Sequence, residues 1–502
     1  MSRYSPISLA TSALILFAPS ALAEITADDV WADWQTYLKS FGYSVQGQEQ
    51  RAGDQLIITG VKMDMVTDDV AGGSITMDRI VMTEQSDGSV SINLPAITPM
   101  TFTSLDAQGR TARMSMDYRH TDLEILASGS PDALRYTYAA EDFTFETTGV
   151  EINGEVMPPE LTNIDVTLQN LSGTSTSTRG GTYAYAQDLA VASLRYAISA
   201  VDPGTQDIFN VSGQMQDLGF QGQSEMPLDA GTPGNMNDML ENGLTTEGTF
   251  DFAASASTVD VSSAGETLAA ALISGPGSLD VSLAENRLQY DVRQSQTQME
   301  VSGTEVPFPM SVEIKDTAFN LLMPLRQSDT PEDFAFGLTF DGFSMSEALW
   351  GLFDPTAQLP RDPATIALDL AGKARLLFDF LDPTETMDLP TGQAPAEIEN
   401  VDIRQLLVTA LGAKLTGTGA FTFENPEVGP PEPQGAIDLT LTGANALIDR
   451  LIATGLLPQE QAMGARMMMG LLAVPGDAPD TLNSRIEINA EGHVLANGQR
   501  IQ

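Results

Sequence analysis

The sequence predicts a predominantly β fold of the α+β type, with long curved antiparallel sheets in two similar halves, an N-terminal capping helix and C-terminal helices. The main observation is a period-two alternation of apolar and polar residues, which places one face of each strand on an apolar interior. It recurs in Val90, Ile92 and Leu94, in Leu279, Val281 and Leu283, and in Leu288, Tyr290 and Val292. Short turn segments separate such runs, so successive strands are expected to pair as antiparallel neighbours. Helical patterns are clearest near the two ends of the chain.

The first 23 residues have the features of a secretory signal peptide. Arg3 supplies a positive end, residues 9–19 form a short apolar core, and Ala21-Leu22-Ala23 matches the small-residue cleavage pattern. We therefore expect the mature chain to begin near Glu24 in the periplasm, and an uncleaved signal that anchors the chain is the alternative. No later run reaches the roughly 18–20 uninterrupted apolar residues that a membrane-spanning helix needs.

An amphipathic helix is predicted directly after the signal. Thr26 and Asp29 have the spacing of a capping box, and Gly42 is expected to end the helix. The apolar residues that share one face are Val30, Trp31, Trp34, Tyr37, Leu38 and Phe41. This stripe, with Trp31 and Trp34 as candidate ligand residues, either binds a lipid or a sugar or packs the helix onto a sheet as a cap. Packing on a sheet is the commoner role of such a stripe.

The chain after the signal is divided by a segment that lacks the alternation. Residues 223–243 are rich in Pro, Gly and Met and are predicted to link two units. Residues 24–222 form the N-terminal β-rich half with its capping helix, and residues 244–502 form the C-terminal β-rich half. Helices within the second half are predicted near residues 264–273, 345–353 and 444–473.

The helix expected over Glu460–Ala473 is apolar on almost every side, so it should be buried in protein or inserted in an apolar phase. Flexible Met side chains suit irregular apolar surfaces, which makes Met463, Met467 and Met468 candidate ligand residues. Ordinary core packing is the alternative.

The segment Ser346–Pro363 also departs from the strand pattern. A short apolar helix is predicted there, followed by a stiff Pro-containing link. Trp350 and Phe353 are candidate lid residues over an apolar face. The competing interpretation is a rigid connection in which Arg361 pairs with a nearby acid.

Charge and composition exclude several classes of function. The chain has 24 basic and 68 acidic residues and a net charge of -44. Nucleic acid is excluded as a partner because phosphate binding needs clustered Lys and Arg, and anionic lipid headgroups should be repelled. The absence of cysteine excludes thiol catalysis and Cys-zinc sites.

The sequence contains no pattern that assigns a chemical reaction. Only His120 and His493 are available, so a zinc site with several His ligands is excluded, and neither a Gly-x-Ser-x-Gly elbow nor a phosphate-binding Gly loop is present. Acidic residues are so abundant that no particular carboxylate pair stands out, although a carboxylate-based hydrolase is a minor alternative. We predict that the protein is not an enzyme, and we assign it no catalytic, cofactor or metal residues.

Three segments carry a resemblance to a known family: Leu349–Leu370, Val30–Trp34 together with Phe41–Tyr43, and Asn497–Arg500. They resemble an uncharacterised family of exported alphaproteobacterial proteins, the domain of unknown function 2125. The resemblance covers nearly the whole mature chain and implies no functional residues, because the family has no assigned activity. A more distant similarity in architecture is to AsmA-like envelope proteins, whose curved antiparallel sheets offer an apolar groove to lipid chains.

Two functions are consistent with these observations. The first is a non-enzymatic periplasmic protein that shelters or transfers a lipid or another apolar ligand on an amphipathic sheet. The second is an envelope assembly or interaction scaffold with a fully packed core and no ligand, whose sheet edges meet other envelope proteins. The two differ in whether the apolar faces close on each other.

Overall fold

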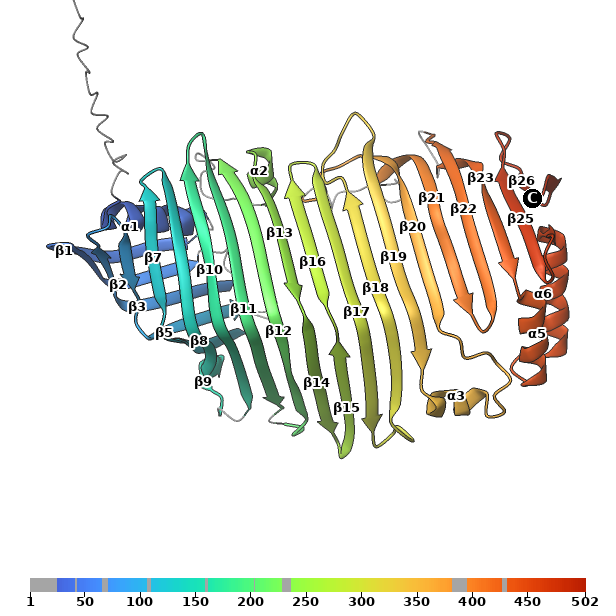
Figure 1. Ribbon diagram of the computed structural model, residues 1–502, viewed down its shortest axis with the longest axis horizontal. Helices are drawn as coiled ribbons and strands as arrows, with labels where there is room; N and C mark the ends of the chain where they lie inside the picture. Colours follow the sequence, from blue (N-terminus) through green and yellow to red (C-terminus); the bar gives the residue numbers. More distant parts are fainter. Residues whose placement is uncertain are drawn as a thin grey trace, which may run out of the picture.

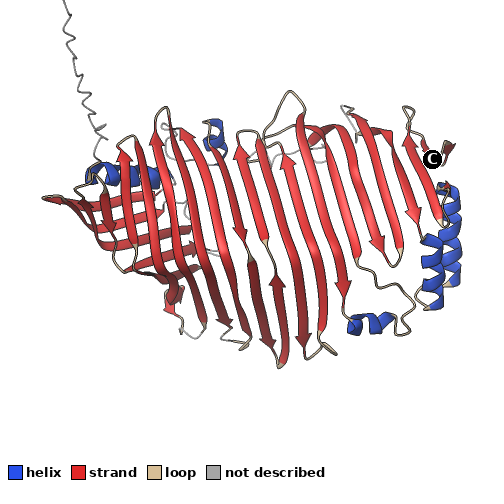
Figure 2. Cartoon of the chain, viewed as in Figure 1, coloured by secondary structure: helices blue, strands red, loops and turns tan. Residues whose placement is uncertain are grey.

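The protein forms one long, curved antiparallel sheet with a few helices at its margins (Figure 1; Figure 2). The computed structural model describes residues 25–40, 43–65, 71–105, 110–158, 161–202, 204–227, 236–381, 395–426 and 431–502. The predicted signal peptide and the middle of the predicted linker lie outside the described residues. Strands make up 67% of the structure, which confirms the predicted fold class.

The sheet contains 27 strands among the described residues. Those before the predicted linker are β1 (Tyr43–Ala52), β2 (Gln55–Met65), β3 (Ala71–Glu84), β4 (Val90–Asn93), β5 (Ile97–Leu105), β6 (Thr111–Thr121), β7 (Glu124–Ser130), β8 (Ala133–Ile152), β9 (Glu155–Val156), β10 (Thr162–Arg179), β11 (Thr182–Val201) and β12 (Ile208–Pro227). Those after it are β13 (Thr245–Phe252), β14 (Ala254–Ser263), β15 (Glu266–Ser274), β16 (Gly277–Ala284), β17 (Arg287–Gly303), β18 (Met310–Met323), β19 (Glu332–Met345), β20 (Ala364–Leu376), β21 (Ala396–Ala410), β22 (Ala413–Glu424), β23 (Glu432–Thr442), β24 (Val474–Pro475), β25 (Thr481–Ile488), β26 (Val494–Ala496) and β27 (Gln499–Arg500). The helices are α1 (Ala27–Ser40), α2 (Met236–Glu241), α3 (Glu347–Phe353), α5 (Ala444–Ala453) and α6 (Gln459–Leu472).

The strands follow one another as an up-and-down meander. Four pairs of short strands lie end to end and act as one long strand each: β4 with β5, β6 with β7, β13 with β14, and β15 with β16. In each case one long neighbour pairs with both members, as β3, β8, β12 and β17 do. Because β12 pairs with both β13 and β14, the sheet continues without a break across the predicted linker.

A line of backbone irregularities crosses the long strands near their middles. Left-handed residues stand at Asn170 in β10 (φ 52°), Asp217 in β12 (φ 50°) and Gln296 in β17 (φ 54°), and Asp122 (φ 50°) separates β6 from β7. The left-handed region is costly for most L-residues, and Asn and Asp tolerate it best. We call this line the crease.

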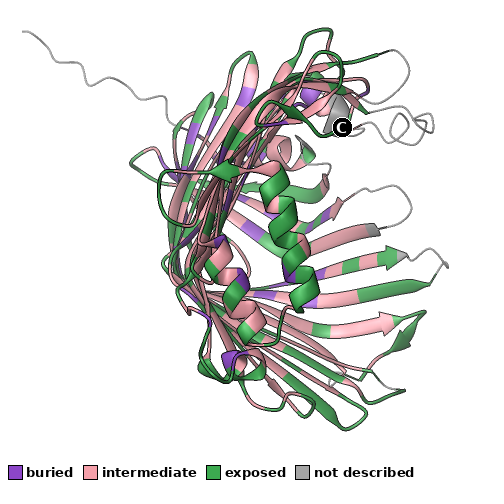
Figure 3. Cartoon of the chain, turned by 90° about the vertical axis from the view of Figure 1, so that its right-hand side faces the viewer, coloured by how far each residue is buried: buried purple, intermediate pink, exposed green. Residues whose placement is uncertain are grey.

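The crease reverses the phase of the apolar alternation. On β10, Ser177 hydrogen-bonds Asp33 of α1, so its side chain faces the inside of the arc. Ile164 faces the inside as well, because it packs against the cluster that contains Tyr118, and Ile75 packs against both this cluster and the core beneath α1. The residue numbers 164 and 177 differ by 13, an odd number, so strict alternation would place the two side chains on opposite faces. The phase change keeps apolar residues on the inner side of the bend. Seen end-on, the sheet is an arc open to one side (Figure 3).

The crease yields a stability prediction. We expect Asn170→Val to lower the free energy of unfolding by about 1–2 kcal/mol, because a β-branched residue is forced into the left-handed region. Asn170→Gly is the control and should be close to neutral, since Gly adopts this conformation freely. Urea unfolding of the two variants checks this, and equal losses would show that the side chain matters more than the backbone angle.

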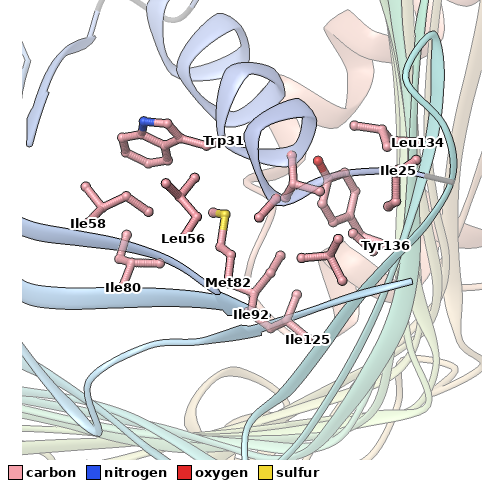
Figure 4. Packing of buried hydrophobic residues seen from close by; sticks show 14 of the residues in the cluster. Ile25, Trp31, Leu56, Ile58, Ile80, Met82, Ile92, Ile125, Leu134 and Tyr136 are labelled. Atoms are coloured by element: carbon pink, nitrogen blue, oxygen red, sulfur yellow. The ribbon is translucent and has the colours of Figure 1, made fainter. Parts of the chain in front are cut away.

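Helix α1 closes the N-terminal end of the arc and covers its main buried core. Its start is the predicted capping box: the Asp29 amide donates to Thr26 Oγ1 at 3.2 Å, and the Thr26 amide donates to Asp29 Oδ2 at 2.9 Å. Val30 of the helix packs in one cluster with fully buried strand residues such as Ile58 and Ile80, which lie beneath the helix (Figure 4). The predicted role of the helix as a cap on the first strands is confirmed.

The buried carboxylate of Asp33 fixes α1 to the strands on the opposite side of the arc. Asp33, 2% exposed, accepts hydrogen bonds from Tyr136 Oη at 2.7 Å and from Ser177 Oγ at 3.0 Å. The Arg179 guanidinium lies 3.1 Å away and Tyr183 Oη donates at 3.3 Å. Burial, together with the Asp33 charge, raises the pKa of Tyr136, so its hydroxyl stays protonated and donates. These contacts join α1 to β8, β10 and β11.

The helix predicted over residues 264–273 is wrong, because this stretch is strand β15. The run Thr267–Ile273 is rich in Ala and Leu, which are strong helix formers. Its backbone nevertheless pairs with β14 on one side and β17 on the other. Two ladders of hydrogen bonds therefore outweigh the local preference.

Candidate apolar ligand trough

The inner face of the sheet is apolar along most of its length. Tyr37 at the end of α1 packs on Tyr185 of β11, with ring centroids 4.8 Å apart, which identifies the inward face of that strand. Residues directly opposite in neighbouring strands share a face. Register carries this face across the sheet through Phe220, Phe250, Leu279, Val281, Tyr290, Val292, Phe319, Leu321, Phe336, Leu338, Leu368, Leu370, Ile403 and Leu406. We call this surface the trough floor.

The other face of the same strands is polar. Asp280, Asp291 and Asn320 stand opposite one another on β16, β17 and β18, between the floor residues of those strands. The amphipathic pattern that predicted the fold therefore has its apolar side on the inside of the arc.

Among the described residues, no second layer of protein covers the C-terminal part of the trough floor, on β19 to β23. Its side chains, such as Phe336 and Leu368, are half-buried rather than buried. Of the three clusters of buried apolar side chains formed by the described residues, none includes a residue of β19 to β23. From β11 to β23 the sheet has ten interstrand spacings, which at about 4.8 Å each give a floor about 48 Å long.

Two hollows deepen the N-terminal part of the inner face. The first, which we call the Tyr37 hollow, has a volume of about 320 Å³ and lies between Tyr37, Tyr185, Phe220 and Phe250. The second, of about 470 Å³, lies where β3, β5 and β6 meet and is lined mainly by apolar side chains, Phe102 among them. Such volumes match small apolar ligands or parts of larger ones.

Residues 243–497 match the model of a family described as an uncharacterized protein conserved in bacteria, DUF2125. The chain belongs to the DUF2125 family. Comparison with curated proteins and with solved structures gives no match. The DUF2125 match spans β13 to β26 and includes α3, α5 and α6, so it contains most of the trough floor. The N-terminal segments of the predicted resemblance lie outside it.

The predicted aromatic residues of α1 lie in the core and not on the trough floor. Trp31 is 3% exposed, and its indole N–H donates to Glu49 Oε1 at 2.7 Å. Trp34 packs half-buried against the same core. Both residues therefore hold α1 on the first strands.

The predicted lid residues lie in the DUF2125-matching part, at the lower rim of the sheet. Trp350 is buried and packs on Phe353, with ring centroids 5.1 Å apart. The Arg361 guanidinium lies 5.5 Å from the Trp350 ring and pairs with Glu347. Asp354 is fully buried and accepts hydrogen bonds from the Gln358 and Leu359 amides. These contacts are those of the rigid connection that the sequence left as an alternative.

The Met-rich helix is not buried within the described part of the chain, and its insertion in an apolar phase stays a prediction. Helix α6 leaves Met463, Met467 and Met468 exposed to 68%, 71% and 50%. Only Ala462 is buried, because α5 separates α6 from the sheet and takes the inner position with Ile448. The three Met residues therefore do not line the trough floor.

The two histidines lie far apart in the sequence, in β6 and near the C-terminus. His120 lies in β6 with Nε2 3.0 Å from the Pro95 carbonyl oxygen, and His493 lies in a terminal turn. In the described ranges no group of three or more His, Cys, Asp or Glu is placed to hold a metal ion. Within those same ranges, no helix is long and apolar enough to cross a membrane.

Sequence reasoning missed the residues that shape the Tyr37 hollow. Gly222 and Gly248 stand opposite each other in β12 and β13 and lower the floor there. Each glycine alone is an ordinary strand residue in the sequence. Their juxtaposition follows from the register of two strands separated by the predicted linker, which no local pattern indicates. Tyr37 was assigned to the helix stripe but not to a site.

Proposed function

We propose that this DUF2125 protein is a non-enzymatic, exported protein of the periplasm that shelters the apolar part of a lipid on the trough floor. The observation that supports the proposal best is the uncovered apolar surface of β19 to β23, on the inside of an arc whose outer face is polar. Exposed apolar patches of this kind mark binding surfaces in soluble proteins. Its length of about 48 Å exceeds the roughly 15 Å of one bilayer leaflet's hydrocarbon layer, so an acyl chain fits lengthwise.

The experiment is to purify the full chain from its native envelope and to identify bound molecules by native mass spectrometry and lipid extraction. We expect co-purifying lipid in the wild type. Leu321→Glu places a charge on the trough floor and should remove at least nine tenths of that lipid, because burying an unpaired carboxylate is costly. Asn320→Glu puts the same charge on the outer face of the same strand and should keep it.

Two results would contradict the proposal: wild-type protein that is always empty, or equal lipid content in the two variants. A scaffold without ligand is the second candidate, and the exposed Met463, Met467 and Met468 stripe of α6 favours it as a contact for another protein. Empty protein with a stoichiometric protein partner after crosslinking in cells would support that candidate instead.

A further inference from the structure

The Tyr37 hollow differs from the rest of the trough floor because its base is made of glycine. Gly222 faces Gln187 on one side and Gly248 on the other, and Gly248 faces Val281. Two adjacent positions thus lack side chains. Both glycines line the hollow of about 320 Å³, and the Phe220 ring lies next to Gly222, where an added Cβ would meet it at 3.1 Å.

Rings enclose the hollow on two sides. Phe220 and Phe250 are cross-strand partners and form one wall. Tyr37 and Tyr185 form the other, which belongs partly to α1 and so closes the end of the trough. One end of a ligand that lies along the trough floor is therefore expected in this hollow.

The polar side chains that line the hollow carry hydroxyls, two amides and one carboxylate, and the hydroxyls and the Gln187 amide lie on the inner face. The Tyr185 hydroxyl donates to Gln187 Oε1 at 3.4 Å, and it also hydrogen-bonds the Tyr37 hydroxyl. Ser224 and Thr246 add two further hydroxyl groups to the lining. Burial, with Tyr185 close by, raises the pKa of Tyr37, so this phenol stays uncharged. These groups can donate to or accept from a neutral polar group.

The electrostatics disfavour an anion at this place. The described residues of the lining include no Lys, Arg or His, and their one carboxylate, Glu247, lies between the inward positions Thr246 and Gly248. The chain as a whole carries a net charge of -44. A phosphate or carboxylate in the hollow would lose water without gaining a cation.

We propose that the Tyr37 hollow binds the uncharged, hydroxyl- or ester-bearing end of a neutral lipid. The acyl chain of that lipid then runs over Leu279 and Val292 toward Phe336. From β13 to β19 this path crosses four interstrand spacings, or about 19 Å, enough for one leaflet-length acyl chain of about 15 Å. The inference rests on the proposed function, because it assigns a ligand class to the same trough.

The test measures binding of three probes that share one acyl chain: monoolein, oleate, and 1-oleoyl-lysophosphatidylglycerol. Equilibrium dialysis of delipidated full-chain protein at pH 8, below the critical micelle concentration of each probe, gives the three dissociation constants. We expect monoolein to bind about tenfold more tightly than either anion, because only the neutral end keeps its hydrogen bonds without an unpaired charge.

Three variants locate the effect. Gly248→Leu should weaken monoolein binding at least tenfold by filling the hollow, and a Cβ at this position meets its neighbours at ordinary distances of 3.7 and 4.0 Å, so the fold tolerates it. The double variant Tyr37→Phe, Tyr185→Phe should remove the preference for monoolein while leaving oleate binding unchanged. Gln221→Leu lies on the outer face of β12 and is the matched control, with binding like the wild type.

The outcomes separate the two proposals. If none of the three probes binds, the proposed function fails. If all three bind equally, or an anion binds best, or the Tyr→Phe pair keeps the preference, the lipid trough stands and the neutral-end assignment is overturned.

Discussion

Replacement of Asp33 by alanine is expected to lower the free energy of unfolding of the N-terminal region by about 3–5 kcal/mol, as removal of one member of a buried charged network does. The change leaves Arg179 without its partner and removes the acceptor of the Tyr136 and Ser177 hydroxyls. These groups join α1 to three strands, so the loss should release the helix. Hydrogen exchange of the α1 amides and urea unfolding measure the effect.

The control is Asp28→Ala on the same helix. Asp28 is largely exposed and pairs with Arg51 at 3.0 Å, and a surface pair of this kind contributes about 0–1 kcal/mol. A loss for Asp33→Ala no larger than for Asp28→Ala would show that the buried network is not what holds α1. A released α1 would also open the closed end of the trough, so the same variant connects stability to the ligand site.

The second prediction compares the stability lost at a buried core residue with the stability lost at a residue of the trough floor. Ile80→Ala, at a fully buried position beneath α1, should cost about 2–5 kcal/mol, because it removes apolar contacts and leaves a cavity. Phe336→Ala removes a larger side chain from the trough floor but should cost less than about 1.5 kcal/mol in ligand-free protein, because water already reaches that side chain and no closed cavity forms.

Urea unfolding of both variants in delipidated protein makes the comparison. Equal costs would mean that the trough floor is ordinary core, closed by protein in solution. Added monoolein offers a second measurement, since a ligand that binds only the folded state raises the stability of the wild type more than that of Phe336→Ala.

Much of the architecture follows from local chemistry that the sequence displays. The capping box at Thr26 and Asp29 determines where α1 begins, and the alternation at Leu279, Val281 and Leu283 determines a strand with one apolar face. Such signals depend on neighbours within a few residues. These signals predicted the antiparallel β fold and the helix that caps its N-terminal end.

The remaining features depend on contacts that a local pattern does not contain. The Ala-rich β15 is a strand because two neighbours pair with it, and α6 is exposed because α5 occupies the inner position. In the sequence, the apolar alternation changes phase around Asn170 and around Asp217. Each change is local, so it does not show that the two positions belong to one line across the sheet. The Tyr37 hollow needs the register of β12 against β13, which the sequence alone does not provide.

The meander connectivity has a consequence for the length of the molecule. From β11 to β23 each strand hydrogen-bonds only with the strands beside it, as in stacked repeats, so the cross-section of the trough there does not depend on how many strands there are. Gain or loss of one hairpin alters the molecule's length by two interstrand spacings, about 9.6 Å, and leaves the arc unchanged. The number of hairpins therefore determines how far the trough floor extends from α1.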